Sequence, residues 1–392
     1  MTNITPKPIS KPTSVRTGGT MGEVLDHITR AGLRLPRIVT LMITKGCNLR
    51  CRHCWPESCS HDVTPPVPTD TLRRLISEFV HLGVEEICLT GGEPFTHPDW
   101  FEILSFTCSQ PGLKRVCLQT NGTLLTEVDI EALHSIGFKG LSVQVSLEGT
   151  TAQTHDRVRG SGSFERAFLG LKLLAEGGLG KQTLVAFTEM EHNFTELPRL
   201  LELLDALGIG RFVSGTLVKG GRAAGTSQLA PPTPSQYREL LSRYYFDAKF
   251  REQYKKLGNI AALEWLEGRS TPSSQGCVCI ETPYVNADGQ MYPCVMLPVD
   301  KFAAKDVFHR PLEEVIIQAV PLWSKLPELN RRRFVELEEC KKCSGRLHCA
   351  GGCMGRAYAA TGDPMSVEDR CALRKTVYSW KDPPKPHHTE EG

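Results

Sequence analysis

Cysteine placement constrains this chain more than any other feature of its sequence. Of its 15 cysteines, 11 fall into two groups, and a long cysteine-free stretch separates Cys117 from Cys277. The total is odd, and residues 1–20 are rich in Pro, Thr and Ser without the apolar segment of a signal peptide. These features indicate reduced thiols in a cytoplasmic protein rather than disulfides. We therefore expect metal ligation from both groups.

The remaining composition is that of an ordinary globular protein. Of the 392 residues, 40% are hydrophobic and 23% are charged, and the formal net charge is +2. A charge this small does not draw a protein to nucleic acid or to an acidic membrane. No apolar run reaches the ~18 residues that a membrane span needs. We expect neither nucleic acid nor a membrane as a partner.

Short apolar segments alternate with helical patterns between residues 37 and 218. This alternation is typical of parallel βαβ units, and about six repeats are too few for an eight-stranded barrel. We therefore predict an α/β fold, a partial (β/α)6 barrel with a C-terminal cysteine-rich domain. The predicted order is a tail and short helix over 1–36, the barrel over 37–225, a helical linker over 226–274, the cysteine-rich domain over 275–380 and a tail over 381–392.

The first cysteine group is a compact loop directly after the first predicted strand. Cys47, Cys51 and Cys54 have the spacing C-x3-C-x2-C. Three neighbouring thiolates can hold three corners of a 4Fe-4S cluster and leave the fourth iron open to a small molecule. A zinc site is the alternative, but zinc usually requires a second cysteine pair nearby, and none is close in sequence. The loop therefore predicts a catalytic cluster.

A second motif ends the next predicted strand, over residues 86–90. It reads Gly91, Gly92, Glu93 and Pro94. Together with the cysteine loop, it resembles the radical S-adenosylmethionine (SAM) superfamily, in which this motif binds the amino group of the methionine moiety of SAM. The resemblance is chemically consistent, because glycines let a backbone approach a ligand closely and Glu93 can face an ammonium group.

Other polar residues resemble positions that contact SAM in the same family. Ser146 ends the fourth predicted strand, and either Arg157 or Arg159 could supply a fork to the carboxylate of SAM. A helix cap and a surface ion pair are the alternatives, and the choice between the two arginines stays open. Asn121 ends the third predicted strand, where a plain Asn-Gly turn is an equal alternative. No catalytic acid or base is assigned.

The second cysteine group resembles the SPASM domain of radical SAM enzymes. Its order is a cysteine pair, then Gly-x4-Cys, then C-x2-C-x5-C-x3-C and a final cysteine. The resemblance implies three 4Fe-4S clusters in all, one that binds SAM and two that are auxiliary. It divides the auxiliary ligands into Cys277, Cys279, Cys294 and Cys353 for one cluster, and Cys340, Cys343, Cys349 and Cys371 for the other. Two structural zinc sites are the alternative, and Cys88, Cys108 and Cys117 are interpreted as core thiols.

The resemblance also implies the reaction. SAM is cleaved reductively to a 5′-deoxyadenosyl radical, which abstracts hydrogen from a substrate. We expect that substrate to be a ribosomally made peptide under maturation. The alternative is oxidation or decarboxylation of a tetrapyrrole or other small-molecule side chain, and the alternative of another class is a non-catalytic electron-transfer or zinc-scaffold protein. Val295 follows Cys294, where sulfatase-maturing relatives carry an Asp, and this argues against sulfatase maturation.

Two protein partners follow from the same resemblance. An electron donor such as a flavodoxin or ferredoxin would reduce the enzyme. Only about 36 residues precede the first predicted strand, fewer than the leader-binding domain of many peptide-maturing enzymes. We therefore expect a separate leader-recognition protein if the substrate is a peptide.

Overall fold

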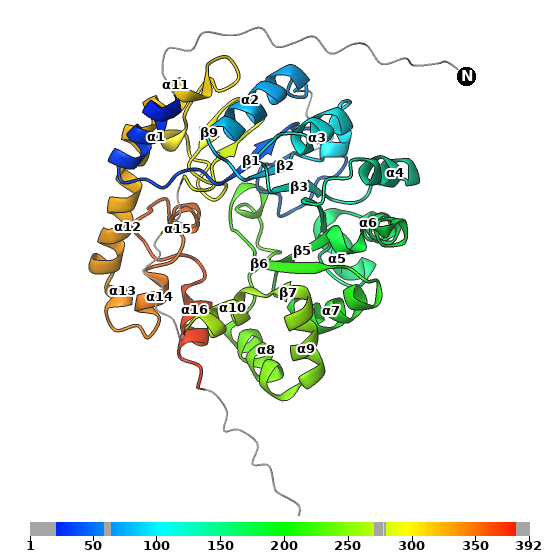
Figure 1. Cartoon of the computed structure of the whole chain (residues 1–392). Helices are drawn as coiled ribbons and strands as arrows, with labels where there is room; N and C mark the ends of the chain where they lie inside the picture. The colour runs from blue at the N-terminus through cyan, green and yellow to red at the C-terminus, as the bar shows by residue number, and fades with distance from the viewer. Residues whose placement is uncertain (1–20, 59–63, 270–276, 278–279, 382–392) are drawn as a thin grey trace, which may run out of the picture.

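The computed structural model describes residues 21–58, 64–269, 277 and 280–381. A parallel sheet lies at the centre, and helices surround it (Figure 1). The C-terminal helices, drawn in orange and red, lie on the opposite side of the sheet from α4 and α6. None of the described helices has both the length and the apolar character that crossing a bilayer would require.

Six parallel strands in chain order form the core of the sheet. Each pairs with the next, as successive βαβ crossovers require. This confirms the predicted partial (β/α)6 barrel. The strands are β1 (Ile38–Met42), β2 (Glu86–Thr90), β3 (Arg115–Thr120), β4 (Leu141–Ser146), β5 (Thr183–Glu189) and β6 (Arg211–Thr216).

Three short strands that were not predicted extend the sheet at both ends. β7 (Gly258–Asn259) lies parallel to β6. β8 (Tyr284–Val285) lies parallel to β1, and β9 (Met291–Tyr292) pairs antiparallel with β8. Within the described residues the order runs from β7 to β9 without closing on itself. The cysteine-rich region thus begins as an extension of the barrel sheet.

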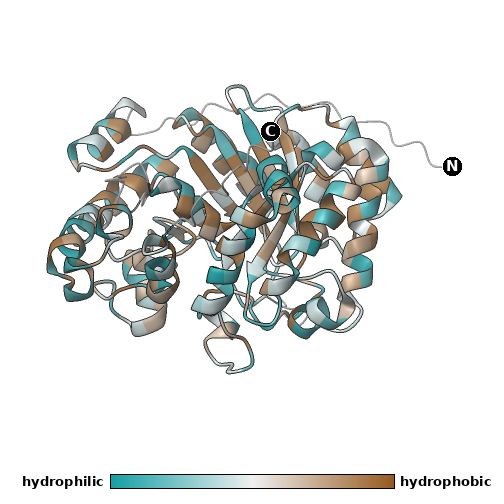
Figure 2. Ribbon diagram, turned by 90° about the horizontal axis from the view of Figure 1, so that it is seen from below, coloured by the Kyte–Doolittle hydropathy of each residue, from teal (hydrophilic) through white to brown (hydrophobic). Residues whose placement is uncertain are grey.

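Amphipathic helices cover the outer face of the barrel. In α2, for example, Leu72, Leu75 and Phe79 are buried, and full burial of such a side chain contributes about 1.5–3 kcal/mol. Figure 2 shows the hydrophobic colouring concentrated on the central strands, with hydrophilic residues on the outer turns of the helices. The helices are α2 (Thr69–His81), α3 (Trp100–Cys108), α4 (Glu127–Ser135), α5 (Ala152–Arg159), α6 (Ser163–Leu174) and α7 (Leu197–Ala206).

Local sequence signals explain where several of these helices begin. Thr126 accepts a hydrogen bond from the backbone of Asp129, whose carboxylate accepts one in return, and this capping box starts α4. Thr233 and Gln236 form the same arrangement at the start of α8 (Pro234–Phe246). Such caps contribute on the order of 1 kcal/mol each.

The segment predicted as a helical linker contains α8, α9 (Ala248–Leu257) and α10 (Ala261–Gly268). The predicted barrel end at residue 225 lies between β6 and α8, and the predicted linker end at 274 lies outside the described residues. α8 and α10 pack against the last helix of the chain. The segment therefore connects the barrel to the C-terminal region through packing as well as through sequence.

The C-terminal region holds more helix than the sequence indicated. α11 and α12 each have 12 residues, although only short elements were expected there. α11 packs against the N-terminal helix α1 (Met21–Arg30), so the C-terminal region contacts the start of the described chain. The helices are α11 (Leu312–Trp323), α12 (Lys325–Glu336), α13 (Glu338–Lys341), α14 (Arg346–Cys349), α15 (Met354–Thr361) and α16 (Cys371–Tyr378).

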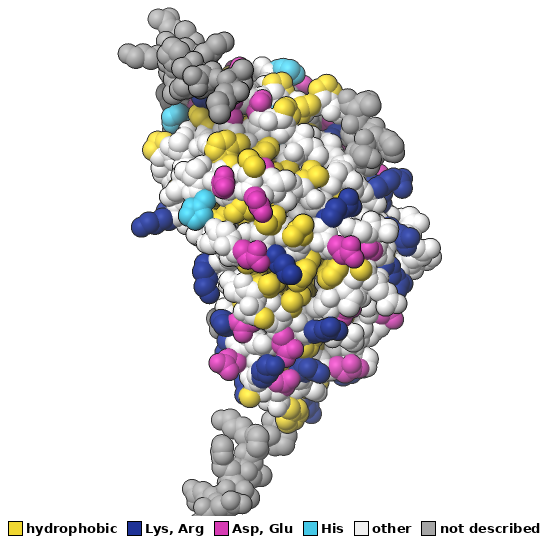
Figure 3. Space-filling view, turned by 90° about the vertical axis from the view of Figure 1, so that its right-hand side faces the viewer, with side chains coloured by type: hydrophobic (Ala, Val, Ile, Leu, Met, Phe, Trp, Pro, Cys, Tyr) yellow, Lys and Arg dark blue, Asp and Glu magenta, His cyan; other side chains and the backbone are white. Residues whose placement is uncertain are grey.

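Of the four cysteines outside the two groups, Cys59 lies outside the described residues, and the three predicted as core thiols are buried. Cys88 of β2 lies opposite Cys117 of the neighbouring strand β3, and Cys108 is the last residue of α3. On the face in Figure 3, Lys and Arg side chains are interspersed with Asp and Glu. That mixture matches the small net charge, and no single-sign field dominates this face.

Candidate active site

One cavity of about 560 Å³ lies between the cysteine loop, the carboxyl ends of the barrel strands and the C-terminal region. Enzymes with α/β barrels place their sites at this end of the strands. Thr90, Gln119 and Thr188 from β2, β3 and β5 form part of its wall. The predicted site residues that line it are Cys47, Cys51, Cys54, Gly91, Gly92, Asn121 and Cys353. The predicted Glu93, Pro94, Ser146 and Arg157 do not line it.

The thiols of the cysteine loop are withdrawn from solvent but have nearby N–H groups. The backbone N–H of Leu49 donates to Cys47 Sγ at 3.4 Å, and Nη1 of Arg159 lies 3.9 Å from Cys51 Sγ. Burial raises the pKa of the Cys47 thiol to about 12. A thiol bound to a metal is deprotonated outright, and its negative charge is then met by these donors. The donor set therefore fits an iron–sulfur cluster.

A clamp from the loop after β6 holds the cysteine loop in place. Nε of Arg222 donates to the carbonyl of Cys51, and Nη2 donates to that of Ser58, both at 2.8 Å. A Cβ atom on Gly221, whose φ is +52°, would lie 2.4 Å from the carbonyl oxygen of Trp55. Sequence reasoning missed Arg222. The only available signal was the Gly-Gly-Arg run that follows the sixth strand.

A buried ion pair lies beside the clamp. The Glu148 carboxylate accepts hydrogen bonds from Nη2 of Arg159 at 2.6 Å and from the backbone of Thr188 at 2.7 Å. Nε2 of His53 lies 3.4 Å from the same carboxylate. Burial alone would raise the pKa of Glu148, but Arg159 and His53 outweigh it and lower that pKa well below its usual range. Glu148 therefore stays ionised and fixes Arg159 against the cysteine loop.

The two arginines that sequence left open have different surroundings. Arg159 is partly buried and lines the cavity. Arg157 is exposed, and its Nη2 donates to the backbone carbonyl of Gln228 at 3.3 Å. Of the two, only Arg159 faces the space where a cofactor could lie.

The Gly-Gly-Glu-Pro motif packs directly on the cysteine loop. A Cβ atom on Gly92 would lie 2.3 Å from the carbonyl oxygen of Gly46, and that carbonyl accepts a hydrogen bond from the Glu93 backbone at 2.8 Å. The buried Glu93 carboxyl accepts hydrogen bonds from the Thr120 hydroxyl and the Asn121 backbone, both at 2.7 Å. Burial raises its pKa to about 7, against the lowering effect of these donors.

Asn121 forms the Asn-Gly turn and also lines the cavity. Its side-chain oxygen accepts a hydrogen bond from the backbone of Thr123, and Gly122 follows with φ +76°, as a turn requires. Its Nδ2 donates to Asn48 and lies 4.0 Å from Cys47 Sγ. Ser146 is half-buried at the end of β4 and lies outside the cavity wall.

The C-terminal cysteines gather in two places. One small cavity of about 20 Å³ is lined by Cys340, Cys343, Cys349 and Cys371. At the other place, burial raises the pKa of Cys353, and the nearby thiols of Cys294 and Cys277 raise it further. The grouping follows the predicted division, but Cys279 lies outside the described residues. In the part of the chain that is described, no three Cys, His, Asp or Glu side chains are arranged to hold a single metal ion.

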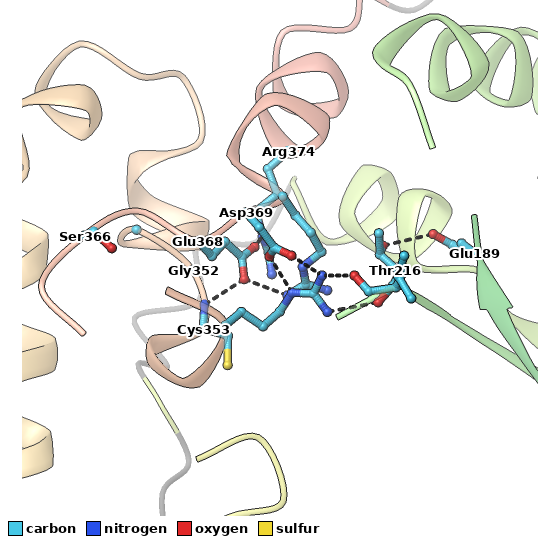
Figure 4. Close-up of polar contacts among 12 residues, drawn as sticks. Glu189, Thr216, Gly352, Cys353, Ser366, Glu368, Asp369 and Arg374 are labelled. Atoms are coloured by element: carbon cyan, nitrogen blue, oxygen red, sulfur yellow. Dashed lines mark hydrogen bonds and ion pairs between the residues drawn. The ribbon is translucent and has the colours of Figure 1, made fainter. Parts of the chain in front are cut away.

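Arg356 of α15 joins the C-terminal region to the barrel. Its guanidinium donates to the carbonyls of Thr216 at 2.9 Å and Leu217 at 2.5 Å, and it pairs with Asp369 at 2.7 Å. In Figure 4, Thr216 lies between Glu189 of the barrel and Asp369 of the C-terminal region. Cys353 lies on the same side of Thr216 as Asp369. Cys353 and Arg356 both line the cavity that also contains the cysteine loop.

Comparisons with known proteins agree with this geometry. Residues 41–204 match the Radical SAM superfamily. An AdoMet-dependent heme synthase of Methanosarcina barkeri is 32% identical over 86% of this chain and 97% of its own length. The antilisterial bacteriocin subtilosin biosynthesis protein AlbA of Bacillus subtilis is 28% identical over 81% of this chain and 67% of its own length.

A solved structure shares the fold at lower identity. The crystal structure of Streptococcus suis SuiB bound to the precursor peptide SuiA has a TM-score of 0.66 and 16% identity, and the match covers 92% of this chain and 83% of that one. The cysteine loop after β1, the Gly-Gly-Glu-Pro motif after β2 and the cysteine-rich C-terminal region occur together in one fold. The chain therefore belongs to the radical SAM superfamily of enzymes.

Proposed function

We propose that this enzyme abstracts hydrogen from one side chain of a ribosomally made peptide. The observation that carries the proposal is the single cavity of about 560 Å³ that joins the cysteine loop to Cys353. It must hold a cluster, SAM and the reacting part of the substrate. Drug-sized ligands fill cavities of about 300–1,000 Å³ by themselves. The space beside SAM therefore suits a single side chain, with the bulk of the substrate outside.

The residues around the cysteine loop have separate roles in this proposal. When bound, the open-iron cluster and SAM supply the electron and the 5′-deoxyadenosyl radical. Cys47, Cys51 and Cys54 hold the cluster, and Arg222 fixes their loop. Glu93 faces the ammonium group of SAM, with Gly91, Gly92 and Pro94 shaping that end of β2. Arg159, rather than Arg157, orients the carboxylate of SAM, and Asn121 and Ser146 complete the predicted contacts.

We propose two auxiliary 4Fe-4S clusters in the C-terminal region. The gathering of Cys340, Cys343, Cys349 and Cys371 around one cavity supports the second of the predicted ligand sets. The proximity of Cys277, Cys294 and Cys353 supports the first. A flavodoxin or ferredoxin as electron donor and a separate leader-recognition protein complete the proposal.

Two relatives favour a peptide substrate. AlbA is named for the biosynthesis of a bacteriocin, and SuiB was solved with a precursor peptide. A second candidate substrate is a carboxylate-bearing tetrapyrrole side chain. The M. barkeri heme synthase favours it, because this chain covers 97% of that protein. The cavity wall gives this candidate some support, because its described residues include four arginines and no Asp or Glu, but carboxylates behind the wall pair with three of them.

Anaerobic reconstitution followed by a 5′-deoxyadenosine assay with dithionite tests the cofactor part. We expect about twelve irons per chain, from three four-iron clusters, together with deoxyadenosine. Cys51→Ala should retain about eight irons and form no deoxyadenosine. About four irons in the wild-type protein would refute the auxiliary clusters, and deoxyadenosine formation by Cys51→Ala would refute the role of the cysteine loop.

The substrate part is tested by mass change. Precursor peptides from neighbouring genes and carboxylate-bearing tetrapyrroles are each incubated with the reconstituted enzyme, SAM and reductant. A peptide that loses hydrogen in step with deoxyadenosine formation supports the first candidate. Loss of carbon dioxide or hydrogen from a tetrapyrrole, with no change in the peptides, replaces it with the second.

A further inference from the structure

Arg333 is a fully buried arginine inside the C-terminal region. Its guanidinium donates to three backbone carbonyls, those of Gly351 and Gly352 at 2.7 Å and that of Ser366 at 2.9 Å. Its Nε is buried without a hydrogen-bond partner in the described structure. Among the described residues, no carboxylate forms an ion pair with it. The hydrogen bonds are thus largely satisfied, but no ion pair neutralises the positive charge.

The segment before Cys353 is built around this guanidinium. Gly351 and Gly352 both have positive φ, +83° and +78°, a conformation that side chains disfavour. A Cβ atom on Gly351 would lie 3.1 Å from Nη2 of Arg333, and one on Gly352 would lie 2.2 Å from Cδ of Glu368. Two consecutive glycines therefore let this backbone pass between a buried cation and a buried anion.

Glu368 neutralises Arg333 only in part, because it acts on Arg333 without an ion pair and is already paired with two other arginines. Its carboxylate pairs with Arg370 at 2.7 Å and with Arg374, and it accepts the Cys353 backbone N–H at 2.8 Å. Figure 4 shows Glu368 beside Arg374 and Cys353. Two cations thus share one anion, and Arg333 lies nearby as a third positive charge. A buried charge without a counter-charge is costly, so a protein that retains one needs negative charge from another source.

The predicted cluster ligands are the remaining source of negative charge. Burial lowers the pKa of Arg333, and negative charge on Cys353, on Glu368, on Cys277 and on Cys349 acts in the opposite direction. Cys353 and Cys277 belong to the first predicted auxiliary set, and Cys349 belongs to the second. The hydrogen bonds of Arg333 to Gly351 and Gly352, which lie between Cys349 and Cys353 in sequence, place the guanidinium beside ligands of both sets.

We propose that Arg333 is a positioning residue that links the two auxiliary clusters electrostatically, with its charge stabilising the reduced state of each. The inference rests on the proposed function, because it needs both clusters. Reduction adds one negative charge to a cluster, and a fixed cation in a low-dielectric interior favours that change. The three carbonyls hold the guanidinium between the sets, so one side chain raises both reduction potentials.

The test is redox titration followed by electron paramagnetic resonance. Cys47, Cys51 and Cys54 are first changed to Ala in the full chain, so that only the auxiliary clusters give signals. In this background, Arg333→Gln should lower both midpoint potentials at unchanged iron content. Arg333→Lys, which keeps the charge, should lie closer to the parent. The matched control is Arg332→Gln, an exposed neighbour on the same helix that pairs with Glu336; it should leave both potentials unchanged.

Each outcome decides a different question. A parent protein without auxiliary iron refutes the proposed clusters themselves. With both clusters present, unchanged potentials in Arg333→Gln, or a shift in only one cluster, refute the link. If Arg333→Gln loses iron, Arg333→Lys decides between charge and structure. If the Arg333→Lys variant retains its iron, the positive charge is what the clusters require. If both variants lose iron, Arg333 has a purely structural role and the proposal is overturned.

Discussion

Two buried glutamates near the cysteine loop differ in charge because their neighbours differ. Glu148 is paired with Arg159, so its pKa lies well below the usual range despite burial. Glu93 has only neutral donors within hydrogen-bonding distance in the described structure, and its pKa rises to about 7. The first carboxylate is satisfied by the protein itself. The second gains most from a cationic ligand, which fits the ammonium group of SAM.

SAM binding should therefore depend on pH through Glu93. Below about pH 7 the Glu93 carboxyl is protonated and neutral, so it cannot pair with an ammonium group. Raising the pH from about 6 to 7 ionises it, and the dissociation constant should fall by up to about tenfold per pH unit. Anaerobic titration calorimetry of the reconstituted enzyme measures this. Glu93→Gln should bind more weakly and lose the slope, and a slope retained in that variant would contradict the assignment.

Replacing the two neighbouring arginines distinguishes their roles. Arg159→Lys keeps a positive charge beside Glu148 but loses the planar fork that a carboxylate prefers. We expect SAM to bind about tenfold more weakly, which corresponds to roughly 1.4 kcal/mol. Arg157→Lys is the matched control, and its exposed side chain should leave affinity within about twofold. The reverse ranking in an equilibrium binding measurement would restore Arg157 as the carboxylate contact.

Among the structural elements, the six core strands could be predicted and the shorter ones could not. β1 to β6 are five to seven residues long, buried and separated by amphipathic helices, so their pattern is visible in sequence. β7, β8 and β9 have two residues each, which is too short for any periodicity. The division of the C-terminal cysteines came from the family resemblance and stays a prediction, although one of its two sets lines a common cavity. Contacts like those of Arg222 depend on tertiary packing and left no pattern.

At the scale of structural elements, the clamp after β6 can be tested for its hold on the cysteine loop. Gly221→Ala forces a side chain into a left-handed conformation, at about 1–2 kcal/mol, and into the backbone of Cys54 and Trp55. The cysteine loop must then move, so the variant should lose about four irons and deoxyadenosine formation. Gly225→Ala is the control, because a Cβ atom there meets nothing within 4 Å. Full iron content in Gly221→Ala would show that the cluster tolerates displacement of the clamp.

Over the whole molecule, the cysteine-rich region is held together by residues distant in sequence. Cys340, Cys343 and Cys349 come from one stretch around α13 and α14, and Cys371 comes from the start of α16, yet all four line one cavity. If a cluster joins them, loss of one ligand affects the entire region. Cys343→Ala should therefore reduce iron by about four and lower the thermal stability of the C-terminal region. Calorimetry paired with iron analysis checks this, and unchanged iron would remove Cys343 from the ligand set.

The joint between the barrel and the C-terminal region depends on Arg356. Its removal leaves the Asp369 carboxylate without its partner and the carbonyls of Thr216 and Leu217 without donors. Breaking a buried pair of this kind costs on the order of 3–5 kcal/mol. In Arg356→Ala, hydrogen exchange should accelerate at the end of β6 and around Cys353, while the cysteine loop keeps its iron. Arg331→Ala, which removes an exposed pair with Glu328, should change neither. Exchange as slow as in the wild type would mean that the two regions are held together by apolar packing alone.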